Sequence, residues 1–301
     1  MIRIVTDSVA SIPKEQTQAL GIQVVSLHVH HNGQEFVDAD MDVDEFYAHI
    51  GEMVDNIPTS SQPSTHDFET TFGRIAQDGD ELLGIFMSAR MSGTVDAATQ
   101  AAEAIVVQHP GFRYSIIDST TNSYDEAFSV LVAAQARDEG CTLEECTERA
   151  LHAVESSRFL FTPETLVFLK NGGRIGSAAA LLATLVKIRP IITVSDGESA
   201  TFARIRTTRK ALASIAKKLR EDAAEFKLKD IVVHYIGASD GAREWAKNVI
   251  EPIAKRQVPV LPVSPVIGCH VGPAMGIAYR CDATLPGKIS FPAIRLLRKS
   301  W

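Results

Sequence analysis

The first half of the chain alternates between apolar runs of strand length and apolar residues repeated at helical spacing. The run from Leu82 to Met87 is typical of a strand buried on both faces of a sheet. Further strands are expected over residues 2–5, 22–30 and 114–117. Helices are expected over 13–21, 46–54, 64–75 and 124–139, after residue 92, and after residue 142, where Thr142 and Glu145 form a capping box. This alternation predicts a parallel sheet with helices on its faces.

Beyond about residue 155 the pattern changes to shorter segments broken by glycines. Residues 168–176 contain a glycine-broken turn, and strand-like segments follow at 191–194, 200–205, 231–235 and 258–263. Two helical stretches separate some of these segments, which predicts a second α/β domain with a mixed sheet. Earlier in the chain, Asn32-Gly33 is a strong hairpin signal. We therefore expect an α/β protein with domains at 1–155 and 156–281 and a basic, apolar extension at 282–301.

Composition narrows the class of protein. Of the 301 residues 45% are hydrophobic and 22% are charged, and the formal net charge is −7. A nucleic-acid-binding function is not expected, because it needs a basic face. No apolar run approaches 18 residues, and the N-terminus lacks the pattern of a secretory signal. The four cysteines show neither a CxxC pair nor a disulfide-framework spacing, so we expect reduced thiols in a cytoplasmic protein.

Two hydroxyl-rich segments could bind an anion. Thr59-Ser60-Ser61 precedes a proline on a rigid turn, although serine and threonine favour turns in any case. Ser92-Gly93-Thr94 follows a buried strand and begins a helix. Both the carboxyl edge of a parallel strand and the N-terminus of a helix favour ligands. Ser92 could equally cap its own helix.

Two further segments carry a cation or an imidazole. Gly172-Gly173-Arg174 permits close backbone approach beside a planar cation suited to a carboxylate. His270 lies in a Gly/Pro-rich stretch that predicts a turn, where its role is either structural or functional. The chain has no GxGxxG after a strand, no Walker A loop, no HExxH and no GxSxG elbow, which argues against dinucleotide, P-loop nucleotide, zinc-protease and α/β-hydrolase functions. No cofactor and no metal are expected.

Taken in order, these segments resemble the DegV family over about residues 1–281. The motifs that carry the resemblance are Ile-Val-Thr-Asp-Ser at 4–8, Ser-Gln-Pro-Ser at 61–64, Ser-Gly-Thr at 92–94, Asp-Ser at 118–119, Phe-Leu-Lys-Asn-Gly-Gly-Arg-Ile at 168–175 and His-Val-Gly-Pro at 270–273. The resemblance implies two α/β domains with a long-chain fatty acid between them, its acyl chain in a tunnel. The implied ligand-binding residues are Thr59, Ser60, Ser61, Ser92, Gly93, Thr94, Arg174 and His270.

The best-understood relatives of this kind resemble the fatty-acid-binding subunit of bacterial fatty acid kinase. The resemblance therefore implies a non-catalytic carrier that presents the acid to a separate kinase subunit for acyl-phosphate formation, a step toward phospholipid synthesis. The sequence departs from the family pattern at Ser60, usually threonine, at Val95, usually tyrosine, and at Ala274 and Met275, usually small residues. These departures bear on acyl-chain preference.

Three other hypotheses come from the residues. An acyl hydrolase would use Ser92 as nucleophile, His270 as base and Asp118 as orienter, although the nucleophile elbow is missing. A phosphotransferase acting alone lacks a phosphate loop and a magnesium cluster. The extension mixes basic residues such as Lys288 and Arg295 with apolar ones, so it either touches an anionic membrane surface or packs onto the body of the protein.

Overall fold

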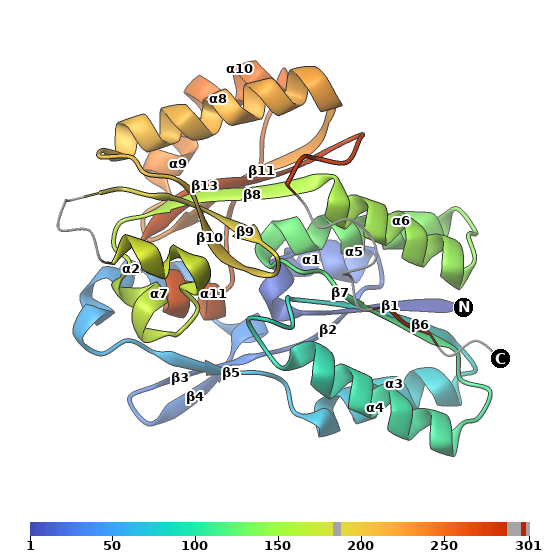
Figure 1. Ribbon diagram of the computed structural model, residues 1–301. Coiled ribbons are helices and arrows are strands. Elements are labelled where there is room, and N and C mark those ends of the chain that lie inside the picture. The colour runs from blue at the N-terminus through green and yellow to red at the C-terminus, as the bar shows by residue number, and fades with distance from the viewer. Residues whose placement is uncertain (183–187, 288–295, 299–301) are drawn as a thin grey trace.

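The computed structural model describes residues 1–182 and 188–287 and the backbone of 296–298, and its strands form three sheets (Figure 1). The first sheet has the order β14-β7-β6-β1-β2. Its parallel strands are β1 (Ile2–Asp7), β2 (Gln23–Val25), β6 (Glu81–Phe86) and β7 (Tyr114–Asp118), and β14 (Leu296–Arg298) pairs antiparallel to β7. The helices are α1 (Lys14–Ala19), α3 (Thr65–Gln77), α4 (Thr94–Gln108), α5 (Ser123–Asp138) and α6 (Leu143–Glu155). The predicted parallel sheet is confirmed.

Both faces of the first sheet are covered by helices, because successive side chains along a strand point to opposite faces. On β6, Leu82 and Phe86 belong to the apolar cluster beneath α3 and α4, whereas Leu83 and Ile85 belong to the cluster beneath α5 and α6. Figure 1 shows α3 and α4 below the sheet and α5 and α6 above it. The continuous apolar run in the sequence reflects this two-sided burial.

The second sheet is mixed, as predicted, and has the order β10-β9-β8-β13-β11-β12. Only the pair β11–β12 is parallel among these six strands. The strands are β8 (Ser157–Pro163), β9 (Ile191–Ser195), β10 (Glu198–Ala203), β11 (Leu228–Ile236), β12 (Val260–Pro262) and β13 (Ala274–Cys281). One face is covered by α8 (Thr208–Phe226), α9 (Asp240–Trp245) and α10 (Glu251–Ala254), and the other face meets α5.

A small antiparallel sheet with three short helices completes the structure. Its order is β4-β3-β5, from β3 (His28–His31), β4 (Gln34–Val37) and β5 (Thr59–Ser61). Beside it lie α2 (Val43–Ala48), α7 (Val167–Asn171) and α11 (Pro265–Val271). An apolar cluster fills the space between the large sheets and includes Val9, Tyr47, Phe159, Phe161 and Val266. This interior holds the cavity described below.

The strand expected over 22–30 is wrong, because the chain leaves the first sheet after β2 and enters the third sheet at β3. Between β2 and β3, hydrogen bonds to side chains take the place of backbone hydrogen bonds to a neighbouring strand. The Leu27 N–H donates to Ser8 Oγ (3.1 Å), and the Ser26 hydroxyl accepts from the Ala39 N–H (3.0 Å). The hairpin predicted at Asn32-Gly33 is confirmed, and both residues have positive φ.

Three other sequence expectations need correction. Thr59-Ser60-Ser61, expected on a rigid turn, forms the strand β5, which pairs with β3. His270 lies in the last turn of α11 rather than in an irregular turn. Pro265 suits the first turn of that helix, and Gly272 (φ +66°) ends it, so the local signals for a helix were present. The first four residues of the glycine-broken turn expected at 168–176 belong to α7, so the turn itself begins at Gly172, and the strand β13 was not predicted at all. The domain boundary near residue 155 falls between α6 and β8 and stays a proposal.

The membrane hypothesis for the extension concerns residues that lie mostly outside the described part of the chain, since 288–295 and 299–301 are not included. The backbone of β14 pairs with β7, so residues 296–298 pack onto the body of the protein. Within the described ranges, none of the helices combines the length and the apolar character needed to span a bilayer.

Replacing Gly276 should destabilise the second sheet. An added Cβ there would lie 2.4 Å from the Leu160 carbonyl oxygen and 2.6 Å from Phe161 Cβ, in the centre of the sheet. We expect Gly276→Ala to lower the free energy of unfolding by about 1–3 kcal/mol in urea denaturation. Gly111→Ala is the matched control, because nothing lies within 4 Å of its added Cβ. Equal stability of the two variants would contradict this packing.

Candidate functional site

A cavity of about 280 Å³ lies between the two large sheets. It opens at the carboxyl ends of β1 and β6, where the strand order of the first sheet reverses direction, and this is where open α/β sheets commonly bind ligands. Its apolar lining comprises Val9, Leu27, Met87, Met91, Phe159, Phe161, Leu169, Val194, Val266, Ile267 and Val271. Its polar lining comprises Ser60, Ser61, Gln62, Ser92, Asn122, Arg174, Ser199 and His270.

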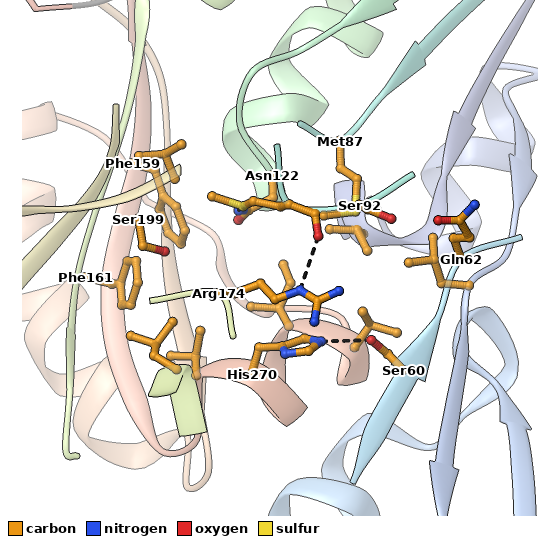
Figure 2. A pocket seen from close by; sticks show the side chains of 18 of the residues that line it. Ser60, Gln62, Met87, Ser92, Asn122, Phe159, Phe161, Arg174, Ser199 and His270 are labelled. Atoms are coloured by element: carbon orange, nitrogen blue, oxygen red, sulfur yellow. Dashed lines mark hydrogen bonds between the residues drawn. The ribbon is translucent and has the colours of Figure 1, made fainter. Parts of the chain in front are cut away.

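The cavity has a polar end and an aromatic end (Figure 2). Arg174 and His270 point toward the side that carries Ser60 and Ser92, while Phe159 and Phe161 stand on the opposite side with Ser199 beside them. The two phenylalanines stack with their ring centroids 5.1 Å apart, and each is only 5% exposed. Because Arg174 is exposed, the polar end faces solvent and the aromatic end is buried.

A small apolar pocket extends the space past the aromatic end. It has a volume of about 20 Å³ and shares Phe159, Phe161, Ile267 and Val271 with the main cavity. His234 also lines this pocket, and burial lowers its pKa to about 4, so its imidazole is neutral. Among the described residues that line this pocket, only His234 and the Tyr235 phenol can titrate. Both are neutral near pH 7, so the lining beyond the phenylalanines carries no formal charge.

His270 contacts Ser60 of β5 across the cavity. Its Nε2 lies 2.8 Å from Ser60 Oγ, whereas its buried Nδ1 has no hydrogen-bond partner among the described residues. Burial, with a smaller effect of the Arg174 charge, lowers the pKa of His270 to about 4, so the ring is neutral near pH 7. A buried N–H without an acceptor is costly, and we therefore assign the proton to Nε2. Nε2–H then donates to Ser60 and leaves the serine hydrogen free to point into the cavity.

Gly172 allows the imidazole of His270 to take this position. A Cβ on Gly172 would lie 2.3 Å from His270 Nδ1. The sequence expectation that this glycine pair permits a close approach is thus met by a side chain of the protein itself. Gly173 follows with φ +70°, a conformation that glycine adopts without strain.

Arg174 is held by backbone carbonyls and not by an acid. Its Nε donates to the Met91 carbonyl (3.2 Å), and its Nη1 donates to the Gly172 carbonyl (2.7 Å). No carboxylate of the described residues lies within ion-pair distance of the guanidinium. With His270 neutral, Arg174 is the formal charge at the polar end, which suits an anion of one negative charge.

Ser92 lies in the loop between β6 and α4. Its Oγ is 2.9 Å from Thr94 Oγ1, and Thr94 is itself buried. The helix α4 begins at Thr94 with Gly93, and not Ser92, as its N-cap residue, so the alternative that Ser92 caps the helix is wrong. A Cβ on Gly93 would lie 2.3 Å from Gln62 Oε1, so this glycine makes room for the Gln62 amide.

Hydrogen bonds from the first fifty residues fix the start of α11. The Asp38 carboxylate accepts from the Val266 N–H (3.0 Å) and from the Ser264 hydroxyl (3.2 Å). The Tyr47 hydroxyl lies 2.9 Å from the carbonyl oxygens of both Val263 and Ser264. We call this group the α11 anchor; it also includes Ser11 Oγ, which accepts from the Ser264 N–H (2.9 Å). The anchor connects the helix that carries His270 to the first half of the chain.

The structure brings most of the predicted site residues together. Ser60, Ser61, Ser92, Arg174 and His270 line the cavity. The other three predicted residues do not, since Thr59 is exposed on β5, Gly93 packs against Gln62, and Thr94 is buried beneath Ser92.

Three polar lining residues were not predicted. Gln62 lies inside the quoted Ser-Gln-Pro-Ser motif, and Asn122 follows β7 just before α5, at the same edge of the sheet as Ser92. The rule that selected Ser92, a polar residue between a parallel strand and a helix, could also have selected Asn122. Ser199 lies on β10, and no local signal in the sequence marks it.

The geometry does not assemble the relay of the hydrolase hypothesis. His270 bonds to Ser60, and Ser92 bonds to Thr94. Asp118 accepts from the backbone N–H groups of Ala89 (3.3 Å) and Thr120 (2.8 Å) and is outside the cavity lining. A serine relay needs the base on the nucleophile and an acid on the second ring nitrogen, and neither contact is formed.

Metal and thiol chemistry find no assembled site in the described ranges. No group of three or more His, Cys, Asp or Glu side chains there could hold a metal ion. All four cysteines are free, and burial raises the pKa of Cys146, Cys269 and Cys281, so these thiols are not activated as nucleophiles.

Fold and cavity together define an α/β protein whose two large sheets enclose a mostly apolar cavity with one polar end. The chain belongs to the DegV family, since the family model described as "Uncharacterised protein, DegV family" matches residues 1–282. A DegV domain-containing protein of Clostridium acetobutylicum is 38% identical over 290 residues, covering 94% of this chain and 99% of the relative. One from Clostridium perfringens is 35% identical, covering 92% and 98%.

Two solved structures share the fold over nearly their whole length. A DegV family protein from Thermus thermophilus, described for its fatty acid binding, is 29% identical with a TM-score of 0.83 and covers 93% of this chain and 99% of its own. DegV from Bacillus subtilis, described as a fatty acid binding protein, is 25% identical with the same TM-score and the same coverage.

Two buried acids lie behind the cavity wall. Asp7 ends β1 and accepts from the N–H groups of Val9 and Met87, both of which line the cavity (2.9 Å each). Burial raises the pKa of Asp7 to about 7. Burial, and next the charge of Asp7, raises the pKa of Glu126 well above its ordinary value. Glu126 Oε2 has no hydrogen-bond partner among the described residues.

Stability should therefore fall as the pH rises. In the unfolded chain Glu126 ionises near its ordinary pKa, whereas the folded protein keeps the carboxyl neutral. The stability that is fully present below the ordinary pKa of Glu126 is therefore lost as the pH rises above that value. We expect Glu126→Gln to flatten the decline of the melting temperature between about pH 5 and pH 9. Glu103→Gln on the exposed face of α4 is the control and should follow the wild-type profile. A parallel decline in all three proteins would refute a neutral Glu126.

Proposed function

We propose that this chain binds a long-chain fatty acid with its carboxylate at the polar end of the cavity and its acyl chain along the apolar lining. The observation that carries the proposal is Arg174, a cation without an acidic partner in the described part of the chain, at the open end of a mostly apolar cavity. The family relationship supports it, because the Thermus and Bacillus relatives are described as binding fatty acids.

The two ends of the cavity divide the work of recognition. Burying about sixteen methylenes at ~0.8 kcal/mol each offers on the order of 13 kcal/mol before the costs of association. Each charge-assisted hydrogen bond to the carboxylate adds about 1.5–3 kcal/mol. The acyl chain therefore supplies most of the affinity, while Ser60, Ser92 and Arg174 select an acid and orient it.

We further propose that the bound acid is presented to a separate kinase subunit in the cytoplasm. The polar end opens to solvent at Arg174 and Gln62, so a carboxylate held there would face outward. A carboxylate oxygen would attack the γ-phosphorus of ATP held by the partner, and the bond to ADP would break to leave an acyl phosphate. This chain contributes no phosphate-binding loop of its own to that step.

Ser92 should contribute to carboxylate binding, whereas Thr59 should not. Losing one charge-assisted hydrogen bond in Ser92→Ala should raise the Kd for a fatty acid about 10- to 100-fold. Thr59→Ala is the matched control, because this hydroxyl lies outside the cavity. Titration with a fluorescent fatty acid, alongside the melting temperature of each variant, gives both readouts. Wild-type affinity in Ser92→Ala at an unchanged melting temperature would remove Ser92 from the site.

The proposal itself is tested by mass spectrometry of lipids extracted from the natively purified protein. We expect about one fatty acid per chain, either as purified or after incubation with a mixture of fatty acids. An empty extract after both treatments would refute the fatty-acid proposal. The chain lengths recovered would at the same time show how much of the small pocket past Phe159 and Phe161 is used.

A further inference from the structure

Charge is distributed very unevenly along this chain. Residues 15–73 contain 11 acidic residues and no lysine or arginine. The whole chain has 37 acidic and 30 basic residues, so the remainder has 26 acidic and 30 basic residues and is slightly positive. The net charge of −7 therefore comes from one segment, which includes α2 and the small sheet with Ser60 on β5.

This acidic segment contains an open groove between β4 and α2. The groove has a volume of about 600 Å³. Apolar side chains lie along it, and Phe36 and Val37 are exposed by 38% and 41%. Its acidic lining residues are Glu35, Asp40, Asp42 and Glu45, and His31 and His49 also line it. No lysine or arginine of the described residues is part of the lining, and Lys14 pairs with Asp40 from outside it (3.3 Å).

Both walls of the groove are packed against elements that form the polar end of the cavity. The first wall, β4, pairs with β3, which pairs on its other side with β5, the strand of Ser60. His30 on β3 contacts Ser61 directly, with Nε2 2.9 Å from Oγ. The second wall, α2, carries Tyr47, whose ring lies where a Cβ on Gly268 would be, in the helix of His270. A partner in the groove would therefore sit beside the open polar end.

We propose that this groove, called here the acidic groove, docks the kinase subunit through an apolar segment flanked by lysine or arginine. The inference rests on the proposed presentation of the fatty acid. An apolar groove with an acidic edge attracts a basic, apolar segment and repels nucleic acid and anionic membranes, which carry the same sign of charge. A second copy of this chain would place the acidic edges against each other, so the charge also opposes self-association.

The test compares two double charge reversals with equal changes in net charge. Glu35→Lys/Glu45→Lys changes the acidic groove. Glu103→Lys/Glu148→Lys changes exposed positions on α4 and α6, away from it. Asp42 is left intact, because its carboxylate accepts from the Glu45 N–H at the start of α2. Each protein, loaded with the same fatty acid, is measured for its affinity to the purified fatty acid kinase catalytic subunit encoded by the same genome, and for ATP-dependent acyl-phosphate formation.

The groove variant should bind the kinase subunit at least about tenfold more weakly than the wild type, with fatty-acid affinity and melting temperature unchanged. The control variant should behave as the wild type. The wild-type complex should also weaken more steeply with added salt than any residual complex of the groove variant.

The possible failures are distinguishable. A groove variant that binds the kinase subunit and supports acyl-phosphate formation as the wild type does would overturn the acidic groove and leave the proposed function standing. If both variants bind the kinase subunit equally more weakly than the wild type, the effect comes from net charge alone, and the acidic groove is not the docking site. If the loaded wild type neither binds the kinase subunit nor yields acyl phosphate, both the groove's partner and the kinase role are wrong, while fatty-acid binding is judged separately by the lipid extraction.

Discussion

The position of α11 depends on hydrogen bonds that cross from one half of the chain to the other. Asp38, Tyr47 and Ser11 hold the backbone just before and within the first turn of this helix. These groups are buried or partly buried, so each lost partner would leave a polar group without water or protein to satisfy it. Because His270 and three apolar lining residues, Val266, Ile267 and Val271, lie on α11, the shape of the cavity follows from this anchor.

Two glycines allow polar side chains to pack closely at the polar end of the cavity. Gly172 lies against His270, and Gly93 lies against Gln62, at distances that no side chain would allow. The imidazole is thereby buried and neutral, and Arg174 stands as the charged group beside it. One cation beside a neutral imidazole would balance one negative charge, as the proposed carboxylate ligand requires.

Much of the first sheet could be predicted from the sequence, because strands buried on both faces give continuous apolar runs and their helices give regular spacing. The capping box predicted at Thr142 forms, and Ser64 caps the helix expected to start there. The split between β2 and β3 could not be predicted, since it depends on side-chain hydrogen bonds from Ser8 and Ser26 that exist only in the folded chain. β13 escaped for a related reason, because it reads as a glycine- and alanine-containing stretch and is stabilised by two neighbours from distant parts of the sequence. At the site, residue types and motif order selected five lining residues. Ser199 could not be selected, because the folding of β10 alone brings it to the cavity.

The polar end is shared between the two halves of the chain, and this has a mechanical consequence. Ser60 and Ser92 come from the part before residue 155, whereas Arg174 and His270 come from the part after it. The two parts meet here through the contact of His270 with Ser60 and the bond from Arg174 to the Met91 carbonyl. An anion touching hydroxyls on one side and the guanidinium on the other would act as a cross-brace between the two sheets. Pulling the halves apart would then require breaking the contacts with the ligand first, so the occupied protein would be stiffer than the empty one.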